Sequence, residues 1–148
     1  MVRFLLLLGK SMTTMNFSGK KILIVDDNKD LTQIISIVLA GQGFEVLECA
    51  ELEDGKHLVQ NWQPDLLVLD INVNGHDGRS FCSELKQSNS CPVKIIMMSG
   101  YDHNLGAAIW HGADDFIAKP FGMDDLLGKV NLQLTNQFIE NKQTASSI

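Results

Sequence analysis

The sequence has no apolar run long enough to cross a membrane and no excess of basic charge. Its longest apolar run, residues 4–8, is far shorter than the roughly 20 residues of a membrane-spanning helix. The formal net charge of −6 argues against a nucleic-acid-binding surface, which is normally basic. We therefore expect neither a membrane nor a nucleic acid as a partner.

Cysteine is scarce and follows no recognisable spacing. The three cysteines, Cys49, Cys82 and Cys91, form no CxxC pair and cannot all form disulfides with one another. This usage is typical of reduced thiols in the cytoplasm, where we expect the protein to reside. The four histidines also lack the spacing of metal ligands.

Both ends of the chain differ from the part between them. A basic residue followed by the apolar residues 4–8 hints at a secretory signal, but the run is short and no cleavage site clearly follows. We predict a flexible extension over residues 1–19, one domain over residues 20–140, and a polar, frayed tail over residues 141–148.

Within the predicted domain, short apolar runs alternate with amphipathic stretches. Runs without polar alternation are typical of strands that are covered by helices on both faces of a parallel sheet. The predicted strands are residues 21–25, 44–49, 65–70, 93–98 and 116–118. The predicted helices are residues 30–39, capped by Asp30, then 53–62, 79–87, 105–111 and 124 to about 139. This order predicts an α/β fold, a doubly wound parallel sheet of five strands with five helices.

Polar side chains stand at the carboxyl ends of four predicted strands: Asp26 with Asp27, then Asp70, Ser99 and Lys119. The carboxyl ends of parallel strands share one edge of a sheet, where such folds bind their ligands. Each residue alone is common in a turn, a helix cap or a strand exit. The functional interpretation therefore depends on all of them meeting at one edge.

Carboxylates that gather at one point repel one another unless a hard cation compensates them, and Mg²⁺, or Mn²⁺ in its place, is the natural candidate. A carboxylate beside such a cation is a competent nucleophile towards phosphorus. Phosphoryl transfer needs mainly positioning and charge neutralisation, to which Lys119 would contribute its charge and Ser99 a hydrogen bond. The pattern predicts a phosphoryl-accepting site at Asp70.

Four segments resemble one known family: ILIVDDN (22–28), PDLLVLDINVNGHDG (64–78), KIIMMSG (94–100) and GADDFIAKPF (112–121). In letters, spacing and strand context they are similar to the receiver domains of two-component response regulators. The resemblance implies a flavodoxin-like sheet with strand order 2-1-3-4-5. It also implies a stand-alone signalling module, not an enzyme, in which Asp70 takes a phosphoryl group from a histidine kinase or a histidine phosphotransfer protein.

The same resemblance assigns the residues around the phosphoacceptor. Asp27 would be a direct magnesium ligand, Asp26 would act through water, and Asn72 would offer its backbone carbonyl. Lys119 would be followed by a cis proline, Pro120.

Ser99 and Phe116 hold the family's switch positions. On phosphorylation Ser99 would move towards the phosphoryl group and Phe116 would turn inward, which would change the surface formed by residues 105–111, 116–118 and the last helix. A downstream protein would bind this surface, with Trp110 as an aromatic anchor for that partner or for a phosphorylation-dependent dimer. Partial burial of Trp110 in a monomer is the alternative.

Two positions depart from the family pattern. Asn74 stands where the family usually has proline, so we expect a looser loop after Asp70. Tyr101 lies two residues beyond Ser99, beside the path of the hydrolytic water in the family. We expect its ring to slow autodephosphorylation. Asn72 is also expected to modulate the rate of autodephosphorylation.

Two alternatives remain open at the level of sequence. Asp70-Ile71-Asn72-Val73 loosely resembles the DxDx motif of haloacid-dehalogenase-type phosphatases, although Asn72 cannot act as the general acid of that motif. A receiver-like module that binds proteins without being phosphorylated is the other alternative.

Overall fold

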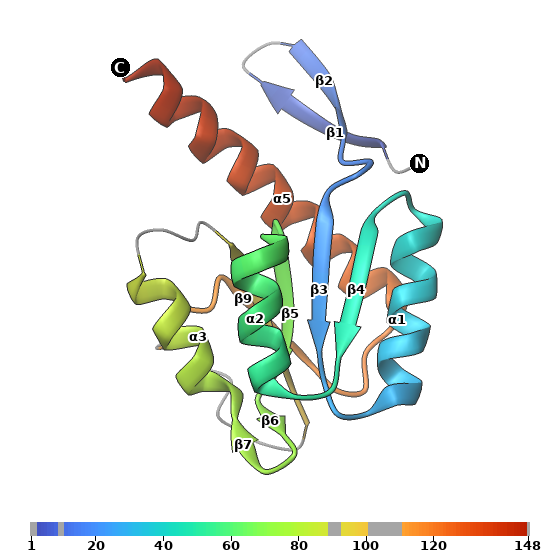
Figure 1. Cartoon of the computed structure of the whole chain (residues 1–148). Helices are drawn as coiled ribbons and strands as arrows, with labels where there is room; N and C mark the ends of the chain where they lie inside the picture. The colour runs from blue at the N-terminus through green and yellow to red at the C-terminus, as the bar shows by residue number, and fades with distance from the viewer. Residues whose placement is uncertain (1–2, 9–10, 89–92, 101–110, 148) are drawn as a thin grey trace.

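A parallel sheet of five strands forms the centre of the structure, a computed structural model that describes residues 3–8, 11–88, 93–100 and 111–147 (Figure 1). The strand order is β4-β3-β5-β8-β9, and all four neighbouring pairs are parallel. In chain order these strands follow the expected 2-1-3-4-5 arrangement. Their bounds are β3 Lys21–Val25, β4 Glu45–Cys49, β5 Leu66–Asp70, β8 Lys94–Ser99 and β9 Asp115–Ala118.

Helices cover both faces of this sheet, which explains why its strands are apolar at every position. Side chains alternate between the two faces of a strand. Ile22 and Ile24 therefore pack against helices α1 and α5, whereas Leu23 and Val25 pack against α2 and α3, and all four side chains are fully buried. The helices are α1 Lys29–Gly41, α2 Leu52–Trp62, α3 Gly78–Gln87 and α5 Met123–Ser146.

The predicted elements between residues 20 and 140 are confirmed apart from details. The helix expected at residues 105–111 falls almost wholly on residues 101–110, outside the described ranges. The cap of α1 is Asn28 and not Asp30, because the Asn28 side chain accepts a hydrogen bond from the Leu31 backbone N–H at 3.2 Å. Asp30 lies inside the first turn, where its charge still favours the helix.

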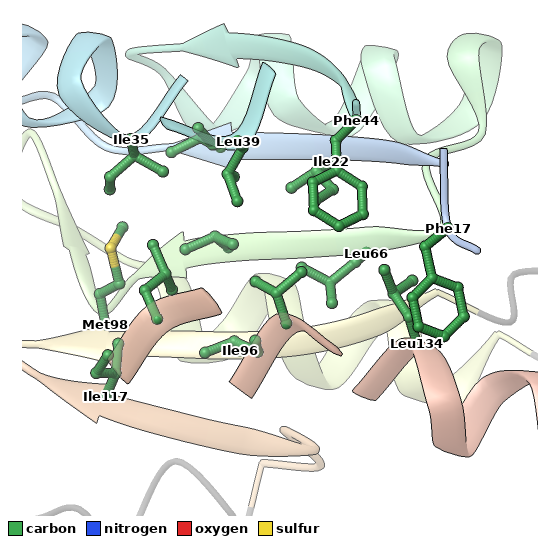
Figure 2. Packing of buried hydrophobic residues seen from close by; sticks show 14 residues of the cluster. Phe17, Ile22, Ile35, Leu39, Phe44, Leu66, Ile96, Met98, Ile117 and Leu134 are labelled. Atoms are coloured by element: carbon green, nitrogen blue, oxygen red, sulfur yellow. The ribbon is translucent and has the colours of Figure 1, made fainter. Parts of the chain in front are cut away.

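The N-terminal segment, for which the sequence predicts a flexible extension, contains two strands. Strands β1 (Arg3–Leu8) and β2 (Ser11–Asn16) form a separate antiparallel pair, in which Arg3 pairs with Asn16 and Leu8 with Ser11. The helical and buried-strand patterns of the sequence do not reveal a ribbon of this kind. The packed domain also begins earlier than residue 20, because Phe17 is 2% exposed and lies beside Leu134 (Figure 2).

The C-terminal tail is also more regular than predicted, since α5 continues to Ser146. Two long-range contacts hold the turns just before this tail. The Glu140 carboxylate lies 2.8 Å from Lys94 Nζ on β8, and Gln137 Nε2 donates to the Asp65 carbonyl at 2.9 Å. No helix in the described part of the chain is both long and apolar enough to span a membrane.

Candidate functional site

The carboxyl ends of the central strands bring the predicted polar residues to one edge of the sheet. Asp70 is the last residue of β5 and pairs with Met98, and Ser99 is the last residue of β8. Asp26 follows β3 directly, and Lys119 follows β9 directly. The expectation that these residues share one edge is confirmed.

Three carboxylates meet there, and we call Asp26, Asp27 and Asp70 the acidic cluster. One oxygen from each lies within 4.8 Å of the other two. Asp26 is 1% and Asp70 8% exposed, whereas Asp27 faces solvent. Oxygen donors with an open side fit Mg²⁺, which prefers a few carboxylates and keeps several of its waters.

Lys119 is the cation that faces the acidic cluster. Its Nζ lies 2.6 Å from Asp26 Oδ2 and 3.4 Å from Asp70 Oδ2. Its backbone N–H donates to the Ser99 carbonyl at 2.6 Å, and the Lys119–Pro120 peptide bond is cis, as expected. One ammonium group cannot neutralise three carboxylates, so an excess of negative charge remains for a divalent cation to balance.

Asp70 titrates unusually for a carboxyl group. Burial, followed by the negative charge of Asp26, raises the pKa of Asp70 from 3.8 to about 6, although Lys119 and the backbone N–H of Asn72 act against the increase. The ionised form of Asp70 is therefore poorly solvated at neutral pH. A cation beside it, or a covalent bond to one of its oxygens, would relieve that cost.

The loop after Asp70 forms a short hairpin, and the expectation that it is looser than in the family stays a prediction. Strands β6 (Asn72–Val73) and β7 (His76–Asp77) pair across Asn74 and Gly75, whose φ values of 51° and 80° are typical of a type I′ turn. Val73 is fully buried beneath this hairpin. The Asn-Gly pair is itself a hairpin signal, but the flanking strands are too short for a periodic pattern to reveal.

Gly78 is a site residue whose role the sequence did not predict. A Cβ atom at this position would lie 2.1 Å from the Asp70 carbonyl oxygen, and the Gly78 N–H donates to the Ile71 carbonyl at 2.6 Å. Asp77 caps α3 by accepting from the Arg79 N–H at 2.9 Å, and its hydrogen bonds to the Arg79 side chain lower the pKa of Asp77. Helix α3 therefore begins directly against the backbone of Asp70.

The two predicted switch residues lie on neighbouring strands. Ser99 is 1% exposed, and Phe116 in β9 is half-buried against the apolar cluster that α2 and α3 cover. Lys129 of α5 lies with its Nζ 5.8 Å from the centre of the Phe116 ring and 3.1 Å from the Asp115 carboxylate. Tyr101 and Trp110 lie outside the described residues.

Comparison with known proteins gives one consistent result. The family model of the response regulator receiver domain matches residues 22–131. A response regulator from Chloroflexus aurantiacus is 29% identical with a TM-score of 0.74, and the match covers 80% of this chain and 99% of that one. A receiver domain from Bermanella marisrubri is also 29% identical, with a TM-score of 0.74 and coverage of 79% and 99%. NtrX from Brucella abortus is 26% identical with a TM-score of 0.77, and the match covers 86% of this chain but 29% of NtrX.

Proposed function

This chain belongs to the family of response regulator receiver domains, and from that premise we propose that Asp70 accepts a phosphoryl group from a histidine kinase or a histidine phosphotransfer protein. One observation carries the proposal. A buried carboxylate ends the central strand β5, with two further carboxylates within 4.8 Å and a lysine ammonium group 3.4 Å away.

The acidic cluster would hold the divalent cation. Asp27 and Asp70 would be direct ligands, the Asn72 backbone carbonyl would be a third, and Asp26 would act through water. Asn28 supports this arrangement, because its backbone N–H donates to Asp26 Oδ1 at 2.9 Å and so orients that carboxylate. When bound, Mg²⁺ or Mn²⁺ supplies positive charge beside the phosphoryl oxygens.

In the transfer step, an Asp70 oxygen attacks the phosphorus of the donor's phosphohistidine, the P–N bond breaks and the imidazole leaves with its electron pair. Lys119 then forms an ion pair with a phosphoryl oxygen in place of its contact with Asp70, and the Ser99 hydroxyl donates to another oxygen. The product is an aspartyl phosphate on Asp70. The chain is therefore a phosphoacceptor that assists its own modification, and not an enzyme with a separate substrate.

Phosphorylation would be transmitted through Ser99 and Phe116 to the surface of β9 and α5. Movement of Ser99 towards the phosphoryl group frees space for the Phe116 ring, and Lys129 on α5 follows that ring. A downstream protein in the cytoplasm binds the changed surface, as a complex with the monomer or with a phosphorylation-dependent dimer. Trp110 remains the proposed aromatic anchor, and Tyr101 the residue proposed to slow hydrolysis of the aspartyl phosphate.

The phosphatase alternative finds less support. Its general acid would stand at Asn72, whose side-chain oxygen accepts a hydrogen bond from the Gly75 N–H at 2.9 Å. An amide in that position has no acidic proton to donate to a leaving group.

Mass spectrometry of the intact chain after treatment with acetyl phosphate and Mg²⁺ tests the proposal. We expect the wild type to gain one phosphoryl group and Asp70→Asn to gain none. A receiver domain similar to this chain, RstA of Klebsiella pneumoniae at 25% identity, is described as activated by BeF₃, so beryllofluoride is a suitable second probe. Equal modification of the two proteins would place the phosphoryl group elsewhere, and no modification of either would favour the phosphorylation-independent module.

A further inference from the structure

Asn74 connects the loop after Asp70 to the residues that follow the carboxyl end of strand β4. Its Nδ2 donates to Glu51 Oε1 at 2.6 Å and to the Ala50 carbonyl at 3.3 Å. We call this pair of hydrogen bonds the Asn74 bridge. It joins residues that are 23 and 24 positions apart in the chain, so it arises from the tertiary structure and not from the local turn.

The segment that receives the Asn74 bridge also contacts the backbone of Asp26. The Asp26 N–H donates to the Cys49 carbonyl at 3.2 Å, and Cys49 directly precedes Ala50 and Glu51. Residues 49–51 therefore contact the Asp26 backbone on one side and the loop of Asp70 on the other. Through this segment the two loops that carry the carboxylates are linked.

The hydrogen-bonded backbone of the loop connects Asn74 to Asp70. Asn72 Oδ1 accepts from the Gly75 N–H at 2.9 Å, which closes the turn, and the Ile71 carbonyl, between Asp70 and Asn72, accepts from the Gly78 N–H at 2.6 Å. A displacement of Asn74 would move the short ladder of β6 and β7, and with it the Asn72 backbone. The Asn72 carbonyl, a proposed ligand of the cation, would move with it.

The backbone conformations on both sides suit the Asn74 bridge. Asn74 has a φ of 51°, a left-handed conformation that asparagine tolerates better than most residues. Proline cannot adopt it, since its ring holds φ near −65°. Glu51 occupies the N-cap of α2 but makes no capping hydrogen bond there, and its carboxylate accepts from Asn74.

We propose that Asn74 is a positioning residue for the acidic cluster. Through the Asn74 bridge it sets the spacing between Asp26 and Asp70 and directs the Asn72 carbonyl, and so it determines the affinity for a divalent cation. The proposal rests on the cation site of the proposed function, but it concerns cation binding before any phosphoryl transfer.

Calorimetric titration of Mg²⁺ into the full chain, without a phosphoryl donor, tests the role of Asn74. Asn74→Gly keeps a residue that favours positive φ and removes only the amide. We expect it to weaken Mg²⁺ binding about 10-fold, the low end of the loss caused by removing a hydrogen-bonding partner of a metal site. Gln63→Gly is the matched control, because Gln63 is also an amide residue with a left-handed φ, of 55°, but lies at the end of α2 away from the cluster.

A pair of variants at Glu51 gives a second test without a change in the turn. Glu51→Gln and Glu51→Leu remove the same charge, but only glutamine leaves an oxygen that can accept from Asn74. We expect Glu51→Gln to bind Mg²⁺ several-fold more tightly than Glu51→Leu. Amide exchange at Asn72 and Gly75 should become faster in Glu51→Leu and in Asn74→Gly.

Each result decides the proposal. Equal affinities of Asn74→Gly and the wild type, an equal loss in Gln63→Gly, or equal affinities of the two Glu51 variants would overturn it. A wild type that binds no Mg²⁺ would overturn the cation site itself. A wild type that binds Mg²⁺ but takes up no phosphoryl group would remove the proposed function and leave the role of Asn74 intact.

Discussion

The ammonium group of Lys119 lies closer to Asp26 than to Asp70, with Nζ–Oδ2 distances of 2.6 Å and 3.4 Å. Asp26 is 1% exposed, so Lys119 compensates a carboxylate that is almost wholly removed from bulk solvent. The lysine therefore contributes to the folded state as well as to the proposed chemistry, and these two roles can be separated by experiment.

Replacing Lys119 should destabilise the protein most when no divalent cation is present. Lys119→Met leaves Asp26 buried and unpaired, which costs about 3 kcal/mol in the free energy of unfolding. Saturating Mg²⁺ should restore part of this loss, because the cation supplies the missing positive charge. Denaturant titration with EDTA and with Mg²⁺ measures both values, with Lys142→Met, an exposed lysine on α5, as the control. The same loss in Lys142→Met would contradict the prediction.

Asp70 should make the stability of the cation-free protein depend on pH. Its pKa is about 6 in the folded state and 3.8 in a freely solvated carboxyl group, so the folded state binds the proton more tightly. Its contribution to stability is fully present below pH 3.8 and is lost as the pH rises through 6. The free energy of unfolding of Asp70→Asn should therefore exceed that of the wild type by roughly 1–3 kcal/mol near pH 8 and by little near pH 4. Urea titrations in EDTA at the two pH values check this. If the wild type and Asp70→Asn differed by the same free energy of unfolding at both pH values, the ionisation of Asp70 would not be the cause of the pH dependence.

A methyl group at Gly78 should displace the backbone of Asp70. The Cβ of Gly78→Ala would lie 2.1 Å from the Asp70 carbonyl oxygen. We therefore expect the free energy of unfolding to fall by more than about 2 kcal/mol and the cation site to bind more weakly. Gly128→Ala on α5 is the control. Nothing lies within 4 Å of its Cβ position, and alanine favours a helix, so the free energy of unfolding of Gly128→Ala should rise by about 0.5–1 kcal/mol. Thermal unfolding of both variants would show these opposite signs.

The last turns of α5 should be ordered in solution and should depend on Glu140. The Glu140 carboxylate pairs with Lys94 Nζ at 2.8 Å, whereas the seven residues from Glu140 to Ser146 are exposed. Glu140→Ala should speed the exchange of backbone amides near residues 140–146 and cost about 0.5–1 kcal/mol, because Glu140 is largely solvated. Gln143→Ala, one turn later, should change little. Fast exchange in the wild type would indicate the frayed tail that the sequence predicts.

The buried strands could be predicted from the sequence for a simple physical reason. A run such as Leu66 to Leu69 is apolar on both faces of a strand, and only a sheet covered on both sides buries all of it. Once these strands are parallel, their carboxyl ends must share one edge. Asp26, Asp70 and Lys119 could therefore be placed together without coordinates.

Local details at the element boundaries were less predictable. Asn28 and Asp30 are both good helix caps, and only the hydrogen bond to Leu31 distinguishes them. No periodic pattern reveals the pairing of β1 with β2 or the contact of Glu140 on α5 with Lys94.

By itself the sequence determined the layered fold, the edge that carries the site and the identity of its charged residues, because burial and strand direction follow from the order of apolar and polar side chains. Only the tertiary structure decided that Lys119 contacts Asp26 most closely, that the loop after Asp70 is a hairpin, and that Asn74 reaches Ala50 and Glu51. The contacts of Lys119 and Asn74 join residues far apart in the chain. Their geometry depends on strand order and turn conformation together, and a linear pattern of residues specifies neither distance nor direction between two loops.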